Sequence, residues 1–178
     1  MHKIPFSPPD ITEAEIQEVC EALRSGWITT GPKTKEFERQ IAAYCGTDKA
    51  VCLNSATACL EMTLRILGIG PGDEVITSAY TASASPVCHV GAKLVLVDTL
   101  PGSYEMDPQQ LSAAFTERTK AVIPVDVGGI LADYDTIFAI AEDKKALFTP
   151  EGDLQRQIGR VAVVADGAHS FGAQRHGK

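Results

Sequence analysis

The 178-residue sequence has no C-x-x-C pair, no long uninterrupted apolar run and no charged start followed by an apolar segment. The missing cysteine spacing argues against zinc ribbons and thioredoxin-like redox sites. A membrane-spanning helix needs about 20 consecutive apolar residues, and a signal peptide needs its own apolar core. We therefore expect a cytoplasmic protein in which most of the five cysteines are reduced and buried. They are Cys20, Cys45, Cys52, Cys59 and Cys88.

Basic residues are the second shortage. The chain has 16 Lys and Arg against 23 Asp and Glu, a formal net charge of -7. This balance argues against nucleic acid or an anionic membrane as a partner. Hydrophobic residues make up 44% and charged residues 22% of the chain, as in ordinary globular proteins. The length allows one domain with a substantial core.

Short apolar segments alternate with helical patterns along the chain. We predict strands near residues 50–54, 74–77, 93–97, 121–125 and 161–165. Helices between consecutive apolar strands favour a mainly parallel sheet with helices on both faces. The sequence therefore predicts an α/β fold, with residues 1–178 forming a single domain.

Capping residues mark where the helices begin. Thr12 and Glu15 make a capping box for the first helix, and the second helix follows Pro32. Asp107 and Asp133 open two later helices. In the second helix the apolar spacing predicts three inward side chains, those of Phe37, Ile41 and Tyr44.

The segment Val163–Ala173 carries the strongest functional signal. A β-branched strand ends at Asp166, and His169 follows three residues later. Open α/β sheets bind ligands at this end of their strands. An aspartate there suits the protonated ring nitrogen of pyridoxal phosphate, which must stay cationic to act as an electron sink. An aspartate that only begins a turn, and a purely structural histidine, explain the same residues.

Two further strand ends offer ligand-binding groups. Ser55, Ala56 and Thr57 form a small turn before a helical pattern, where free backbone N–H groups and the helix dipole suit a phosphate. Taken alone, the turn is better explained by an ordinary N-cap that binds no ligand. Tyr80 follows the next strand among small residues, and either stacks on a heteroaromatic ring or lies in the core.

Five segments share an order and spacing that resemble one family. They are Gly26–Pro32 with Phe37–Glu38, Asn54–Thr57, Pro71–Ile76, Ala79–Ala82 and Asp166–Ala173. From about Pro5 to the last residue the chain resembles the sugar aminotransferase (DegT/StrS) family of fold type I pyridoxal phosphate enzymes. The resemblance implies the PLP-transferase fold type I major domain, pyridoxal 5'-phosphate as cofactor, and amino transfer to a nucleotide-linked keto sugar.

The resemblance also implies a role for each site residue. Asp166 would hold the pyridine nitrogen, and His169 would contact the phenolic oxygen of the cofactor. The phosphate would be bound by Ser55, Ala56 and Thr57, and the ring would be stacked by Tyr80. The sugar nucleotide would be lined by Trp27, Ile28, Thr29 and Thr30. A homodimer and an amino donor such as glutamate are further expectations from the resemblance.

The sequence departs from the family pattern in three places. Family members carry a Ser-Phe-His-x-x-Lys-like segment a few tens of residues beyond the position of Asp166, and its lysine forms the internal aldimine. The sequence stops at Lys178, which belongs to a polar turn. We therefore expect an incomplete cofactor-binding domain, truncated before the aldimine lysine, with no catalytic residue and no C-terminal small domain.

The other two departures are local. Many members have a histidine at the position of Asp126, which either faces the substrate or caps a strand. The polar stretch Glu142–Arg160 is longer than the usual connection, and we expect it to be a surface insertion.

Three alternative functions remain open at this point. A sugar dehydratase of the same family has a histidine in place of the lysine, at a position beyond Lys178. A naturally shortened, non-catalytic protein would bind a cofactor or pair with a full-length relative. A metal hydrolase built from Asp126, Asp166 and His169 lacks the usual ligand spacing, so no metal is expected.

Overall fold

The computed structural model describes residues 8–177, so Pro5, where the resemblance begins, and Lys178 lie outside the described residues. The chain falls into two compact units, one up to Cys52 and the other from Leu53 onward. Each unit is considered by itself.

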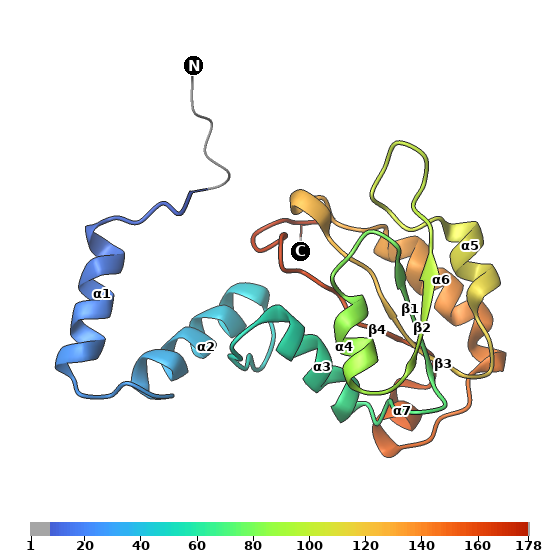
Figure 1. Ribbon diagram of the computed structural model, residues 1–178, viewed down its shortest axis with the longest axis horizontal. Coiled ribbons are helices and arrows are strands. Elements are labelled where there is room, and N and C mark those ends of the chain that lie inside the picture. The colour runs from blue at the N-terminus through green and yellow to red at the C-terminus, as the bar shows by residue number, and fades with distance from the viewer. Residues whose placement is uncertain (1–7, 178) are drawn as a thin grey trace. The chain divides into compact units, whose positions relative to one another are not determined.

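The first unit contains two helices, α1 (Glu13–Arg24) and α2 (Pro32–Cys45), drawn in blue in Figure 1. The predicted capping box is present, and the Thr12 N–H donates to the Glu15 carboxylate over 2.6 Å. The second helix is predicted to follow Pro32, and α2 begins at Pro32 itself.

The prediction that three side chains of α2 point inward is wrong for two of them. Phe37 and Tyr44 have exposed fractions of 55% and 62%, whereas the buried residue of this helix is Ala42. Hydrophobic spacing indicates an apolar stripe on a helix but does not show how deeply each of its side chains is buried.

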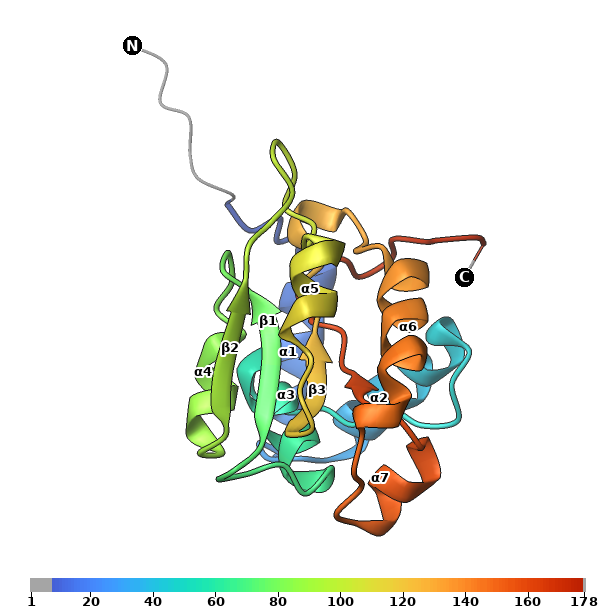
Figure 2. The same ribbon diagram turned by 90° about the vertical axis from the view of Figure 1, so that its right-hand side faces the viewer.

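The second unit contains a four-stranded sheet (Figure 2). Its strands are β1 (Glu74–Ser78), β2 (Lys93–Val97), β3 (Thr119–Ile123) and β4 (Ala162–Val163). Their spatial order is β2-β1-β3-β4, and every pairing is parallel. In the register of the sheet, Ile76 lies between Val95 and Val122. The predicted parallel sheet is confirmed.

The predicted strand at residues 50–54 does not form. The backbone N–H of Cys52 donates to the Glu38 carboxylate over 2.8 Å, so a side chain takes the place of a neighbouring strand. Val51 is 73% exposed, so its side chain is not buried among the described residues.

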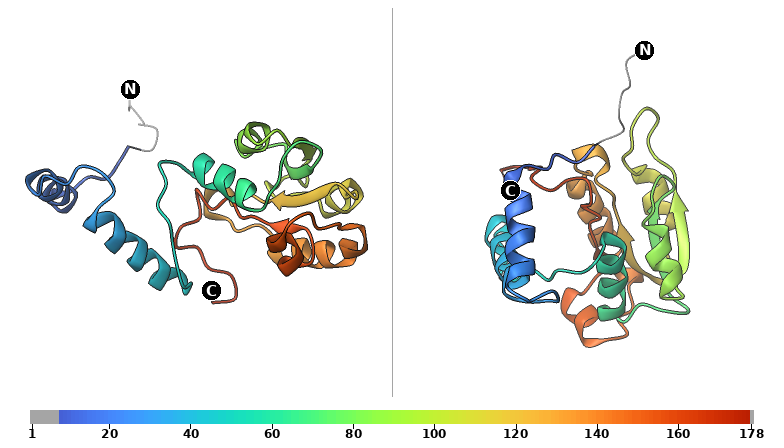
Figure 3. Two further views of the ribbon diagram at one scale, coloured as in Figure 1. Left: turned by 90° about the horizontal axis from the view of Figure 1, so that it is seen from below. Right: turned by 60° about the vertical axis from the view of Figure 1, so that its left-hand side comes forward.

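Helices cover both faces of the sheet, as predicted (Figure 3, left). On one face lie α3 (Ala56–Ile66) and α4 (Ala84–His89), and on the other lie α5 (Pro108–Ala114) and α6 (Tyr134–Asp143). Successive strand residues serve opposite faces. Val75 packs in the core with Leu64, and Ile76 packs in the core with Leu111.

The stretch at residues 142–160 is an integral part of the fold, which corrects the predicted surface insertion. It contains the short helices η2 (Lys144–Leu147) and α7 (Asp153–Ile158). Gln155 is only 3% exposed, and its side-chain amide donates to the Leu67 carbonyl oxygen over 2.8 Å. Lys120, also buried, donates to the Thr149 carbonyl oxygen over 2.6 Å. The polar composition of this stretch suggested an exposed loop, because it does not show that some of its polar side chains are buried and hydrogen-bonded.

The expected burial of the cysteines is also wrong. Cys45, Cys59 and Cys88 are exposed, and the other two are half-buried. In α3 the buried residues are Leu60 and Leu64, so the neighbouring Cys59 points to a different side of the helix.

Candidate active site

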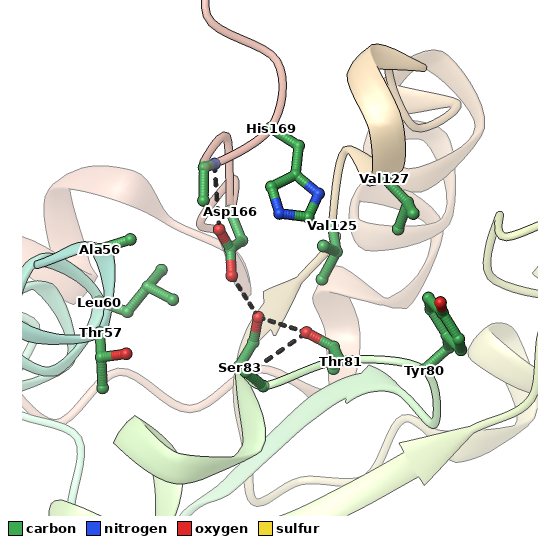
Figure 4. A pocket seen from close by; sticks show the side chains of 12 residues that line it. Ala56, Thr57, Leu60, Tyr80, Thr81, Ser83, Val125, Val127, Asp166 and His169 are labelled. Atoms are coloured by element: carbon green, nitrogen blue, oxygen red, sulfur yellow. Dashed lines mark hydrogen bonds between the residues drawn. The ribbon is translucent and has the colours of Figure 1, made fainter. Parts of the chain in front are cut away.

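A pocket of about 320 Å³ lies in the second unit, next to the carboxyl end of the sheet (Figure 4). Four segments line it: the first turn of α3 and the loops that follow β1, β3 and β4. Five of the six predicted cofactor residues are among its lining residues: Ala56, Thr57, Tyr80, Asp166 and His169. The sixth, Ser55, directly precedes α3. This is the site at which open α/β sheets bind ligands.

Asp166 is fixed through both its backbone and its side chain. Its N–H donates to the Pro124 carbonyl oxygen over 2.9 Å, and its carbonyl oxygen accepts from the Asp126 N–H over 3.1 Å. These bonds extend the pairing of the β3 and β4 segments. On its half-buried side chain, Oδ2 accepts from the Ser83 hydroxyl over 2.5 Å and Oδ1 accepts from the Ala168 N–H over 3.2 Å.

The first turn of α3 presents backbone donors to the pocket. Ser55 is the N-cap, and its hydroxyl oxygen accepts from the Ala58 N–H over 3.1 Å. Ala56 and Thr57 occupy the first helical positions, where N–H groups have no acceptor within the helix. The positive end of the helix dipole lies at the same place. An anionic group such as a phosphate fits this end of the pocket.

Tyr80 and His169 border the pocket from two other loops (Figure 4). The Tyr80 ring lies 5.0 Å from that of Tyr104, centroid to centroid, at an interplanar angle of 39°. Tyr80 is 59% exposed, which excludes the alternative of a core tyrosine. His169 is exposed, so it is not a buried structural histidine.

Asp126 has a structural role, which is one of the two alternatives that the sequence left open. It is 3% exposed, and its Oδ1 accepts from the Ala132 N–H and the Tyr134 hydroxyl, each over 2.9 Å. Its Oδ2 accepts from the Ser170 hydroxyl over 2.8 Å. Burial, together with the neighbouring Asp126 carboxylate, raises the pKa of Tyr134 and keeps its hydroxyl protonated as a donor.

Sequence reasoning missed Thr81, Ser83 and Ser170, whose hydroxyl groups bond to each other or to these carboxylates. Small hydroxyl residues occur in most loops, and nothing local distinguishes these three. The one available signal was their position shortly after a strand end that the sequence had already indicated as part of a binding site.

The predicted sugar-nucleotide residues lie in the first unit. The Trp27 indole N–H donates to the Thr30 carbonyl oxygen over 2.9 Å, and the ring lies against Gly31. Trp27 and Thr29 line a hollow of about 390 Å³ within this unit. Trp27 is 57% and Ile28 80% exposed, so both side chains are accessible in the chain described.

Two other possibilities can be examined directly in the structure. Within residues 8–177, no three His, Cys, Asp or Glu side chains lie close enough together to hold a metal ion. The helices of the same residues include none that is both long and apolar enough to cross a membrane.

The parallel sheet, its covering helices and the position of the pocket define a fold type I pyridoxal phosphate-dependent aminotransferase fold. Residues 9–178 match the DegT/DnrJ/EryC1/StrS aminotransferase family, and the chain belongs to that family. The predicted fold and family are thus confirmed.

Three relatives illustrate this membership. A protein from Streptococcus pneumoniae assigned as a sugar aminotransferase, solved in its PLP form, is 55% identical with a TM-score of 0.93, over 96% of this chain and 44% of that one. The spore coat polysaccharide biosynthesis protein SpsC of Bacillus subtilis is 47% identical over 98% of this chain and 47% of its own length. UDP-4-amino-4-deoxy-L-arabinose–oxoglutarate aminotransferase of Shewanella sediminis is 39% identical over 98% of this chain and 42% of its own length. The chain thus spans less than half the length of each.

Proposed function

We propose that this chain is the cofactor-binding part of a pyridoxal phosphate-dependent enzyme that transfers an amino group to a nucleotide-linked keto sugar. The observation that carries the proposal is the convergence of Ala56, Thr57, Tyr80, Asp166 and His169 on one pocket from three separate segments. The name of the Shewanella sediminis relative supports the substrate class, since it specifies a UDP-linked sugar. The same name specifies oxoglutarate, the keto acid of glutamate, which supports glutamate as the amino donor.

Each end of the pocket suits one part of pyridoxal phosphate. The Asp166 carboxylate suits the protonated ring nitrogen, and the backbone donors of Ala56 and Thr57, with Ser55 beside them, suit the phosphate. His169 would contact the phenolic oxygen, and Tyr80 would border the ring. When bound, the cofactor supplies an electron sink for proton removal next to the amine.

The remaining roles concern the substrate and the assembly. Trp27, Ile28, Thr29 and Thr30 would bind the sugar nucleotide, with the exposed indole offering a flat apolar surface. We further propose a cytoplasmic homodimer, the arrangement implied by the family resemblance. The lysine that moves the proton in family members has no counterpart in residues 1–178, which are left with the tasks of binding and orienting the cofactor.

Cofactor binding tests the proposal directly. The protein expressed at its natural length should bind pyridoxal phosphate and gain absorption in the visible or near-ultraviolet range. Asp166→Ala should weaken this binding by about tenfold or more, because a charge-assisted hydrogen bond to the ring is lost. Asp48→Ala removes an exposed carboxylate as a matched control and should leave binding unchanged.

Turnover identifies the reaction. With glutamate and a nucleotide-linked keto sugar, the same protein should release 2-oxoglutarate and an amino sugar in equal amounts. A deoxygenated ketone as the product would replace this proposal with the dehydratase. Failure of the wild-type protein to bind the cofactor would refute both.

A further inference from the structure

Ser83 is the N-cap residue of α4, yet its hydroxyl makes no capping hydrogen bond to that helix. Serine at an N-cap normally accepts a hydrogen bond from a backbone N–H of the first turn, which stabilises the helix by about 1 kcal/mol. Here no such side-chain bond is made, and the Ser83 hydroxyl instead donates to Asp166 Oδ2 over 2.5 Å. The two residues are 83 positions apart in the sequence. The hydroxyl therefore bonds to a residue of the pocket and not to the backbone of its own helix.

The Asp166 carboxylate sets the direction of this hydrogen bond, and with it the direction of the contact between Ser83 and Thr81. The Thr81 and Ser83 hydroxyl oxygens lie 2.7 Å apart, and the Ser83 N–H donates to Thr81 Oγ1 over 2.9 Å (Figure 4). A serine hydroxyl has one proton, and a carboxylate can only accept. With the Ser83 proton on Asp166, Thr81 must donate to Ser83. The two hydroxyl groups form a one-way chain that ends at the carboxylate.

Burial favours these two hydrogen bonds over contacts with water. Ser83 is 1% exposed, so its oxygen has little access to water as an alternative partner. Together with the Ala168 N–H on Oδ1, the Ser83 hydroxyl holds the Asp166 carboxylate from both oxygens. A carboxylate has about four acceptor sites, so two remain to be directed elsewhere. The pocket is lined by both Ser83 and Asp166.

We propose that Ser83, supported by Thr81, is a positioning residue that aims the Asp166 carboxylate at the ring nitrogen of the cofactor. The inference rests on the proposed function, because it needs pyridoxal phosphate in this pocket. Its effect should depend on the ring nitrogen itself and not on the phosphate or the ring face. That dependence separates positioning from a general contribution to folding.

The test compares pyridoxal phosphate with its 1-deaza analogue, which has carbon in place of the ring nitrogen. In the natural-length protein, Ser83→Ala should weaken binding of pyridoxal phosphate by about tenfold, the loss expected for one hydrogen bond to a charged group. Binding of the deaza analogue should change by less than about twofold. Ser85→Ala, at an exposed serine of the same helix, should change neither affinity.

A second variant covers the case in which Ser83→Ala does not fold. Thr81→Val keeps the shape of the side chain but removes the donor, and should weaken pyridoxal phosphate binding by about threefold with the deaza analogue unaffected. If the variants lose the same affinity for both ligands, or lose none for either, the positioning role is wrong. The proposed function is tested separately, by the loss of pyridoxal phosphate binding in Asp166→Ala. A wild-type protein that binds both ligands equally well would overturn the positioning role alone, whereas one that binds neither ligand would overturn the proposed function as well.

Discussion

The Ser170 hydroxyl donates a hydrogen bond to Asp126 Oδ2 over 2.8 Å, and so ties the loop that carries Asp166 and His169 to the segment after β3. Asp126 is buried, whereas His169 is exposed at the pocket. The position of the histidine therefore depends on a carboxylate that does not line the pocket.

Removing the Asp126 carboxylate should destabilise the protein. Asp126→Ala leaves the Ala132 N–H and the Tyr134 and Ser170 hydroxyls without their acceptor, and should lower the free energy of unfolding by about 2–4 kcal/mol. Asp126→Asn keeps an acceptor oxygen and should cost less than half as much. Urea denaturation at neutral pH measures both. Equal losses would show that charge, and not the acceptor oxygen, is what the site requires.

Glu74 should make stability fall in acid. Burial raises the pKa of Glu74, but hydrogen bonds from Thr116, Lys93 and Arg118 outweigh it and lower the pKa to about 2, from 4.5. The unfolded chain therefore binds a proton at a higher pH than the folded chain. The contribution, about 3 kcal/mol, is complete above pH 5 and is lost as the pH falls toward 2.

Denaturation at pH 7, 5, 4 and 3 checks this dependence. Glu74→Gln should lower stability at pH 7 and flatten its decline between pH 5 and 3, because the titrating group is gone. Glu117→Gln alters an exposed carboxylate nearby and should reproduce the wild-type curve. An unchanged acid slope in Glu74→Gln would assign the decline to other carboxylates.

Gln155 should anchor the stretch at residues 142–160. Its amide donates to the Leu67 carbonyl oxygen over 2.8 Å, and its side-chain oxygen accepts from the Glu151 N–H over 3.0 Å. Gln155→Ala should lower the free energy of unfolding by about 2 kcal/mol, since it leaves a buried carbonyl without a donor. Gln157→Ala, on an exposed position of the same helix, should cost less than about 0.5 kcal/mol. Similar losses would contradict the anchoring role of Gln155, because helix propensity favours alanine at both positions and cannot cause either loss.

Much of the fold could be predicted from the sequence because its signals are local. β-branched runs indicated the strands of the second unit, and Asp107 and Asp133 act as N-caps at the predicted positions. The run at residues 50–54 has the same composition as a strand, but its backbone partner is the Glu38 side chain. Composition alone carries no information about which partner is available.

The candidate site could be predicted only in part, for the same reason. Asp166 and Thr57 are recognisable because each lies where a strand ends or a helix begins. The link from Ser83 to Asp166 joins residues from two different loops, and only the parallel order of the strands brings them together. Hydrogen bonds of this kind depend on the tertiary structure and leave no local pattern.

Gly31 should control the position of Trp27. A Cβ atom at Gly31 would lie 2.1 Å from Cδ1 of the indole, which is far inside contact distance, so Gly31→Ala must displace the ring. The hydrogen bond from the indole N–H to the Thr30 carbonyl oxygen should then be lost. Trp27 is the one tryptophan among residues 1–178, so the tryptophan fluorescence of these residues reports the displacement.

Two measurements on Gly31→Ala separate structure from function. Its tryptophan emission should shift relative to the wild type, whereas Gly152→Ala, where a Cβ meets nothing within 4 Å, should leave the emission unchanged. If Trp27 binds the sugar nucleotide as proposed, adding UDP should quench the wild-type emission, and Gly31→Ala should weaken that binding by about tenfold. A shifted emission with unchanged UDP affinity would confirm that Trp27 packs against Gly31. It would also show that the indole does not contribute to the substrate site.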